Sequence, residues 1–275
     1  MADRELQVDL SGDVVVITGG AGVLCAEMAR ALAARGAAVA LLDVDADAAR
    51  AQAESIRAAG GRALEVRCSV LEREDLERAA RAVEAALGRP TVLINGAGGN
   101  KREATTAPDR SFFDLPADAV RWVFDLNFLG TFLASQVFGK VMAEGEGGSI
   151  VNISSMNALR PLTKIPAYSA AKAAVSNFTQ WLAVHMSQDC GNKVRVNAIA
   201  PGFFLTQQNR FLLIDEKTSG LTPRGQQIVD HTPMGRFGAP EELIGTLLWL
   251  LSDSSKFVHG VVVPVDGGFN AYGGV

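Results

Sequence analysis

The stretch Val14-Val-Val-Ile-Thr-Gly-Gly-Ala-Gly-Val-Leu24 decides the fold. Its first half is apolar on both faces of an extended chain, as strands are when helices cover both sides of a parallel sheet. Its second half is a glycine-rich turn that leads into a helical segment at 26–35. Glycines allow a tight turn and let backbone N–H groups at a helix N-terminus approach a pyrophosphate. The stretch therefore predicts a strand, a turn and a helix that suit a dinucleotide.

The same alternation continues along the chain. Apolar runs recur at 38–42, 63–66, 91–95, 149–154, 193–199 and 261–265, and segments with helical character lie at 46–59, 74–87, 117–143, 167–188 and 240–251. Strand–helix alternation forms βαβ units with right-handed crossovers. We therefore predict an α/β fold, a Rossmann-like doubly wound parallel sheet of about seven strands with helices on both faces, in a single domain over residues 1–275.

Composition narrows the class of protein. The 275-residue chain has a formal net charge of −4, which disfavours nucleic acid or an anionic membrane as its main partner. Its start has no apolar signal core, and its apolar runs are far shorter than the roughly 20 residues that span a bilayer. The three cysteines and three histidines are dispersed, with no metal-ligand spacing. We predict a cytoplasmic protein with reduced thiols and no metal site.

Two connecting segments, 96–114 and 201–238, are longer than simple connectors need to be. Loops of this length in a compact domain are usually functional or disordered. Both follow predicted strands, so both are expected at the edge of the sheet where ligands bind in such folds. We expect the second one to carry a substrate loop at about 203–238.

A carboxylate stands at the end of the second predicted strand, Leu41-Leu42-Asp43. It follows the glycines by roughly 20 residues, where dinucleotide-binding folds carry an acidic residue that accepts hydrogen bonds from the adenosine ribose. Such a carboxylate would repel a 2′-phosphate, so Asp43 favours NAD over NADP. The alternative is a solvated aspartate or a helix cap.

A serine, a tyrosine and a lysine form the strongest chemical pattern. Ser155 ends a predicted strand, and Tyr168 and Lys172, at i and i+4, share one face of a helix. A free phenol titrates near 10, and a nearby ammonium stabilises the phenolate. Lowering that pKa by ~3 units requires roughly 4 kcal/mol. Taken alone, Tyr-x-x-x-Lys is also a common pair on helix surfaces.

Together these motifs resemble those of the short-chain dehydrogenase/reductase family over 13–268. The resemblance implies that Tyr168 donates or accepts the proton, that Ser155 polarises the carbonyl, and that Lys172 binds the nicotinamide ribose and lowers the tyrosine pKa. Asn127 matches the family asparagine that holds a water in the proton relay. The resemblance also implies a homotetramer with its larger contacts on 117–143 and 167–188, and a glycine-rich tail after Asp266 that reaches a neighbouring subunit.

The family pattern also implies a cofactor site, and this sequence departs from that pattern at several positions. Its cofactor positions correspond here to Gly19, Gly22, Val23, Leu24, Asp43, Ser69, Val70, Asn95, Ala97, Gly98, Tyr168, Lys172, Pro201, Gly202 and Thr206. Val23 and Cys25 stand at usual glycine positions, Gly96 replaces an asparagine, and Ser69 stands where many members carry an aspartate. We expect Val23 to restrict the turn and Cys25 to widen the packing of helix against strand.

Within that family the motifs at 22–25, 95–100, 133–140, 200–206 and 266–275 resemble the D-mannonate oxidoreductase branch. This resemblance implies an NAD(H)-dependent enzyme that interconverts D-mannonate and D-fructuronate. The alternatives are another polyol, gluconate-type or 3-oxoacyl reductase of the family, or a nucleotide-sensing protein without turnover.

A sugar acid needs polar partners and a cation for its carboxylate. The loops offer Asn100, Lys101, Arg102, Asn157, Arg160, Lys164, Gln207 and Asn209. From these segments we select Asn100, Asn157, Lys164 and the neighbouring Phe203 as candidate substrate residues.

Overall fold

The computed structural model describes residues 6–206, 210–215 and 218–274. Seven strands form one sheet, in which every paired neighbour is parallel and the order is β3-β2-β1-β4-β5-β6-β7. The strands are β1 (Val14–Thr18), β2 (Ala38–Asp43), β3 (Arg62–Arg67), β4 (Val92–Asn95), β5 (Gly148–Ile153), β6 (Val194–Pro201) and β7 (Val262–Val265). The chain builds outward to β3 and then returns to the other side of β1. This reversal opens a crevice between the carboxyl ends of β1 and β4, and it confirms the predicted fold.

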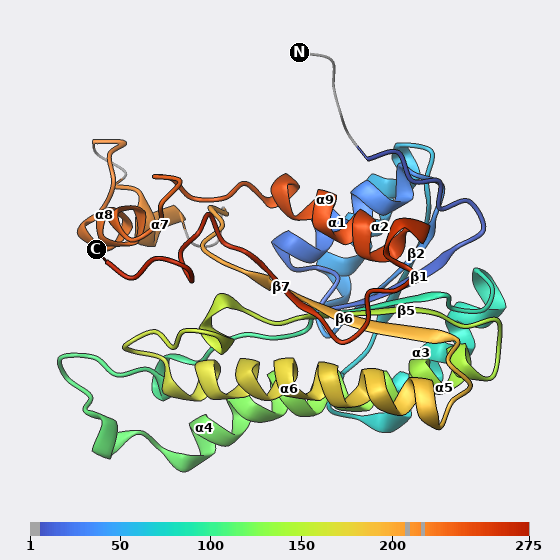
Figure 1. Ribbon diagram of the computed structural model, residues 1–275, viewed down its shortest axis with the longest axis horizontal. Coiled ribbons are helices and arrows are strands. Elements are labelled where there is room, and N and C mark those ends of the chain that lie inside the picture. The colour runs from blue at the N-terminus through green and yellow to red at the C-terminus, as the bar shows by residue number, and fades with distance from the viewer. Residues whose placement is uncertain (1–5, 207–209, 216–217, 275) are drawn as a thin grey trace.

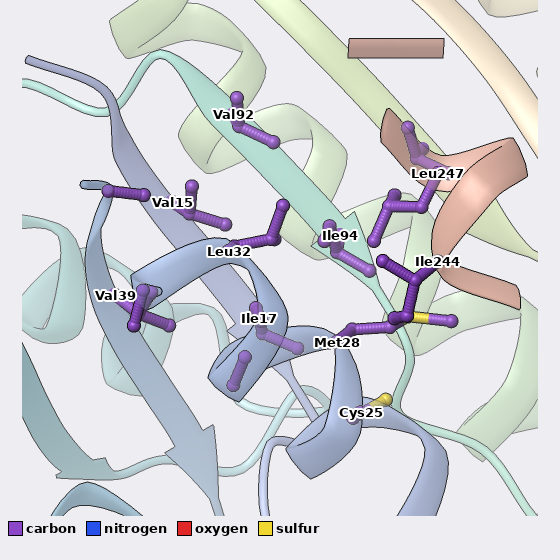
Figure 2. Close-up of a cluster of buried hydrophobic side chains, with 14 of the residues drawn as sticks. Val15, Ile17, Cys25, Met28, Leu32, Val39, Val92, Ile94, Ile244 and Leu247 are labelled. Carbon is purple, nitrogen blue, oxygen red and sulfur yellow. The ribbon is translucent and has the colours of Figure 1, made fainter. Parts of the chain in front are cut away.

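Helices cover both faces of the sheet (Figure 1). The helices α1 (Val23–Ala33), α2 (Ala46–Ala58) and α9 (Ile244–Leu251) lie on one face, and α3 (Arg73–Ala86), α5 (Gly130–Ala143) and α6 (Pro166–Gln188) lie on the other. Alternate residues of β1 pack against the two helix layers. Val15 and Ile17 pack under α1 and α9 (Figure 2), whereas Val14 and Val16 pack under α3, α5 and α6. Because neither face meets water, the strand is apolar on both.

The predicted helix at 117–143 is interrupted. It consists of α4 (Ala117–Phe124), a π-helical turn at Asp125–Leu129 and α5. The N–H of Gly130 donates to the carbonyl of Asp125, an i to i+5 bond that widens the helix. Single π-turns inside α-helices often mark functional sites. This one contains Asn127.

The long segment after β6 contains two helices that were not predicted, α7 (Arg210–Leu213) and α8 (Pro223–Asp230). Thr222 caps α8 by accepting from the N–H of Gly225, and a proline occupies its first turn. A threonine followed by proline is a helix-start signal that the sequence analysis missed. Gln207 and Asn209 lie outside the described residues. The 3-10 turns are Arg102–Ala104, Phe112–Asp114, Met156–Ala158, Pro240–Leu243 and Asp253–Ser255.

Within the described residues, no helix combines the length and the apolar character that crossing a bilayer would require.

Candidate active site

A cleft of about 610 Å³ lies at the carboxyl ends of the strands. Most of the strands end in residues that reach it: Gly19 follows β1, Asp43 ends β2, Gly96 follows β4, Ser155 follows β5 and Gly202 follows β6. Parallel strands place all these ends at one edge of the sheet. Residues far apart in the sequence therefore share one cavity.

The glycine-rich turn forms one end of this cleft. Gly19 has φ +66°, a conformation that favours glycine, and a Cβ there would lie 2.7 Å from the Cα of Ala97. Gly22 is the N-cap residue of α1 and offers no side-chain cap. The first N–H groups of a helix need acceptors, and the helix dipole there favours negative charge. The turn is suited to a pyrophosphate.

The Asp43 carboxylate faces this turn. One oxygen accepts from the N–H of Ala21 at 3.0 Å, and the other accepts from the N–H of Asp45 at 3.0 Å. The bond from Ala21 ties the end of β2 to the glycine turn after β1, and the bond from Asp45 fixes the carboxylate on its own loop. The cleft thus carries a fixed negative group next to its phosphate-binding end, where a further phosphate would be repelled.

The departures at positions 25 and 96 fit each other. Cys25 is buried, and a Cβ added to Gly96 would lie 2.2 Å from its Sγ. The cysteine therefore occupies space that is open only because residue 96 is glycine, and Figure 2 shows Cys25 at the start of α1. Burial raises the pKa of the Cys25 thiol to about 12, so it stays uncharged at neutral pH and packs as a small apolar group.

Lys172 is buried at the centre of the cleft wall. Its Nζ donates to the carbonyl of Ile153 at 2.7 Å and lies 5.8 Å from the centroid of the Tyr168 ring. Both side chains project from the start of α6, as the i, i+4 spacing predicted. Burial lowers the pKa of Lys172 to about 8, so the amine remains mostly protonated at pH 7. A positive charge therefore stands beside the phenol ring.

The pKa of Tyr168 differs from the expectation. Burial raises it above its ordinary value, and a hydrogen bond with Ser155 lowers it by less. The lowering that we expected from Lys172 is therefore outweighed by burial of the phenol. The phenol is therefore protonated at neutral pH. Ser155 Oγ accepts from the N–H of Asn157 at 3.2 Å, which leaves its hydroxyl hydrogen for another acceptor.

Asn127 holds the loop after β4 against Lys172. Its Oδ1 accepts from the N–H of Gly99 at 3.1 Å, and its Nδ2 donates to the carbonyls of Gly99 and Val123, both at 2.7 Å. A Cβ at the adjacent Gly98 would lie 2.6 Å from Asn127 Oδ1 and 3.1 Å from Lys172 Nζ. The asparagine is fully buried, and its bonds to Gly99 fix the loop that forms this part of the cleft wall.

Most of the predicted site residues meet in the cleft. It is lined by Gly19, Gly22, Val23, Leu24, Asp43, Val70, Ala97, Gly98, Ser155, Tyr168, Lys172, Pro201, Gly202, Phe203 and Thr206.

The other predicted residues, Ser69, Asn95, Asn100, Asn127, Asn157 and Lys164, do not line it. Asn95 is buried in the core, where its Nδ2 donates to Ser135 and Asn152 at 2.9 and 2.8 Å. The N–H of Ser69 donates to the carboxylate of Asp75.

The sequence analysis did not assign several apolar or small lining residues to the site. They are Cys25, Leu42, Val44, Cys68, Gly96, Gly99, Leu126, Ile153, Ser154 and Phe204. Nearly all adjoin a motif residue, so proximity to the motifs was the signal available. Among the described residues, no three histidine, cysteine or acidic side chains are grouped as a metal site would need.

Comparison with known proteins agrees with this geometry. A family model described as enoyl-(acyl carrier protein) reductase matches residues 20–270. The chain is 50% identical to the "Uncharacterized oxidoreductase UxuB" of Bacillus subtilis over 98% of this chain and 99% of the relative. It is 33% identical to the 7alpha-hydroxysteroid dehydrogenase of Escherichia coli K12, over 94% of each chain.

A solved structure is more informative. The crystal structure of "a putative D-Mannonate oxidoreductase from Haemophilus influenza" with bound NAD superposes with a TM-score of 0.91 at 49% identity. The match covers 97% of this chain and 98% of that one. Fold, cleft and sequence likeness agree over almost the whole length, and the chain belongs to the short-chain dehydrogenase/reductase family of oxidoreductases.

Proposed function

We propose that this protein is an NAD(H)-dependent oxidoreductase that interconverts D-mannonate and D-fructuronate. The observation that carries the proposal is the convergence of Ser155, Tyr168 and Lys172 on one cleft that has Asp43 at its other end. The choice of substrate is supported by the 49% identical structure named for D-mannonate, since the steroid dehydrogenase is only 33% identical.

The cleft suits NAD. Gly19, Gly22 and the N-terminus of α1 would hold the pyrophosphate, and Asp43 would accept hydrogen bonds from the adenosine ribose. Lys172 would bind the second ribose, and the buried Asn127 would hold the loop at Gly98 and Gly99 beside it. The segment that includes Pro201, Gly202 and Thr206 would hold the nicotinamide. Nicotinamide supplies or accepts the hydride, and the protein supplies orientation and a proton.

Tyr168 is the general acid of the reduction. Its phenol is protonated at neutral pH and would give its proton to the keto oxygen of the substrate as the hydride arrives. Ser155 would donate a hydrogen bond to the same oxygen, because the N–H of Asn157 already occupies a lone pair of its Oγ. The phenolate that results would have the Lys172 ammonium 5.8 Å from its ring centroid, and the oxidised nicotinamide would add a second positive charge. Oxidation of the alcohol reverses each step.

We further propose that the segment 203–238 is the substrate loop and that the enzyme is a cytoplasmic homotetramer. Trp181 and Val184 support the assembly, because α6 leaves more than half of each apolar side chain exposed. Exposed apolar surface of this kind often marks a protein interface. Light scattering on the purified protein tests this: a mass of one subunit, about 29.0 kDa, would contradict it.

The test of function compares the wild-type protein with Tyr168→Phe. With D-fructuronate and NADH, the wild type should consume NADH with saturation kinetics, and the variant should lose roughly 10²–10⁴-fold in turnover. NADH binding, measured by fluorescence, should be similar in both. A protein that binds NADH but turns over no sugar acid would contradict the substrate assignment. Equal behaviour of the two proteins would favour a nucleotide-sensing role.

A further inference from the structure

Arg160 stands on the turn that carries Ser155. After Ser155 the chain makes a 3-10 turn, Met156–Ala158, and the N–H of Arg160 donates to the carbonyl of Met156 at 2.9 Å. The guanidinium of Arg160 is exposed and donates from Nη1 to the carbonyl of Tyr272 near the C-terminus. A charged side chain five residues after Ser155 is therefore held by the tail of the same chain.

The tail itself is ordered by contacts within its own subunit. Asp266 accepts from the N–H groups of Gly268 and Asn270 at 2.9 and 2.8 Å, which forms a compact turn. The Phe269 ring packs edge to face against Phe203, with 5.3 Å between centroids. In Figure 1 the tail runs back from β7 and ends beside α7 and α8. The tail therefore makes contacts within its own chain, and the expectation that it reaches a neighbouring subunit stays a prediction.

These contacts connect two residues that line the cleft. Ser155 and Phe203 both line the cleft, from the ends of β5 and β6. The turn from Ser155 leads to Arg160, and the tail leads from Arg160 back to Phe203. The path runs through Ser155, Arg160, Tyr272, Phe269 and Phe203. Arg160 does not line the cavity, but it is linked at both ends to residues that do, through the chain to Ser155 and through the tail to Phe203.

The charge of Arg160 is not compensated by an acidic side chain of the described residues. Its partner among the described residues is the neutral carbonyl of Tyr272, which takes one of the five N–H groups of the guanidinium. Arg236 differs, because its guanidinium is paired with both oxygens of Glu242. Arginine presents a rigid fork that matches a carboxylate. Arg160 therefore keeps both its charge and donors for an anion.

Lys164, the other cation on this segment, is less suited. Its side chain is exposed, and its ammonium has no hydrogen bond or ion pair with the described residues, whereas its carbonyl accepts from the N–H of Thr106. Fixing a free lysine on a ligand costs side-chain entropy. The Tyr272 carbonyl already restrains Arg160, so less of that entropy remains to be lost on binding.

We propose that Arg160 binds the carboxylate of an acidic substrate, and that the Tyr272 carbonyl orients its guanidinium for this role. The inference rests on the proposed function, since it assumes a sugar acid. It assigns to Arg160 the cationic role that the sequence analysis gave to Lys164. It also makes the tail a part of the substrate site of its own subunit.

The test uses Arg160→Gln, Arg160→Lys and Lys164→Gln in the full-length protein. Kinetics are measured with D-fructuronate and with an uncharged ketose of the same chain length that the wild type reduces. Arg160→Gln should raise KM for the sugar acid roughly 10- to 100-fold, because a charge-assisted pair is lost. KM for NADH and for the ketose should stay within about twofold. Arg160→Lys should recover part of the loss, and Lys164→Gln should change little.

The matched control is Arg50→Gln, which removes an exposed arginine on α2 whose guanidinium is paired with Asp47. It should behave as the wild type. Deletion of 269–275 should raise KM for the sugar acid while Arg160 is still present, because the guanidinium then loses its orienting carbonyl. Thermal unfolding of each variant separates a lost ligand contact from a lost fold.

The outcomes separate the inference from the proposed function. An unchanged KM in Arg160→Gln, a larger effect in Lys164→Gln, or an equal rise in KM for the uncharged ketose would overturn the role of Arg160 while the enzyme remains a sugar-acid reductase. A wild-type protein that reduces only uncharged substrates would overturn both.

Discussion

The paired departures at residues 25 and 96 give a sharp quantitative test of the packing. In Gly96→Ala, the new Cβ would lie 2.2 Å from the Sγ of Cys25 and 2.9 Å from the carbonyl oxygen of Thr18. Neither contact is tolerable, and the second involves backbone that cannot rotate away. Overpacking of this kind costs about 1–3 kcal/mol. For a chain of this size, a loss of ~2 kcal/mol lowers Tm by roughly 4–8 °C.

Removing the cysteine should relieve most of this cost. Cys25→Gly alone should destabilise by about 1–2 kcal/mol, because it places glycine in a helix and removes a buried side chain. In the double variant the Sγ contact no longer exists. The two costs should therefore not add, and the coupling free energy should favour the double variant by about 1 kcal/mol or more.

The assay is thermal and denaturant unfolding of the wild type, both single variants and the double variant. Gly99→Ala is the control, because a Cβ there would meet only Leu126, at an ordinary 3.8 Å. Additive losses in the double variant would refute the explanation that the cysteine and the glycine accommodate each other. So would a Gly96→Ala protein as stable as Gly99→Ala.

Three further predictions follow from the cleft. Asp43→Ala should lower the preference for NADH over NADPH in kcat/KM by at least about tenfold, and an unchanged preference would refute the ribose assignment. Gly98→Ala should reduce kcat, because its Cβ would press on Asn127 and Lys172; unchanged steady-state kinetics would show that the loop yields freely. The pKa of Lys172 is about 8 in the folded protein, against 10.5 for an ordinary lysine. Between pH 8 and pH 10.5 the unfolded state therefore binds more protons than the folded state, and the free energy of unfolding rises with pH. The stability advantage of Lys172→Met should therefore be largest below pH 8 and shrink toward pH 10.5 in unfolding measurements, and a difference independent of pH would contradict the buried charge.

The sequence predicted the fold well because each strand is apolar on both faces, a pattern that parallel sheets between helix layers produce. All seven strands appear within a few residues of their predicted places. The π-turn around Asn127 was not predictable, because it depends on bonds to Gly99, which is distant in sequence. Periodicity alone suggested one continuous helix.

The site was predictable where a motif fixes both residue type and position. Ser155, Tyr168 and Lys172 line one cleft as expected, because the end of β5 and the start of α6 lie at the same edge of the sheet. The direction of the Tyr168 pKa was not predictable, because it depends on how deeply the folded chain buries the phenol. Residue types alone do not reveal that burial.

The most direct test of the central claim is the kcat/KM of the wild-type protein for D-fructuronate with NADH, measured beside the same reaction with NADPH. We expect saturable reduction of D-fructuronate that is strong with NADH and weak with NADPH, because Asp43 would bind the adenosine ribose. Absence of turnover in a protein that still binds NADH would contradict the sugar-acid assignment and leave only the chemistry common to the family.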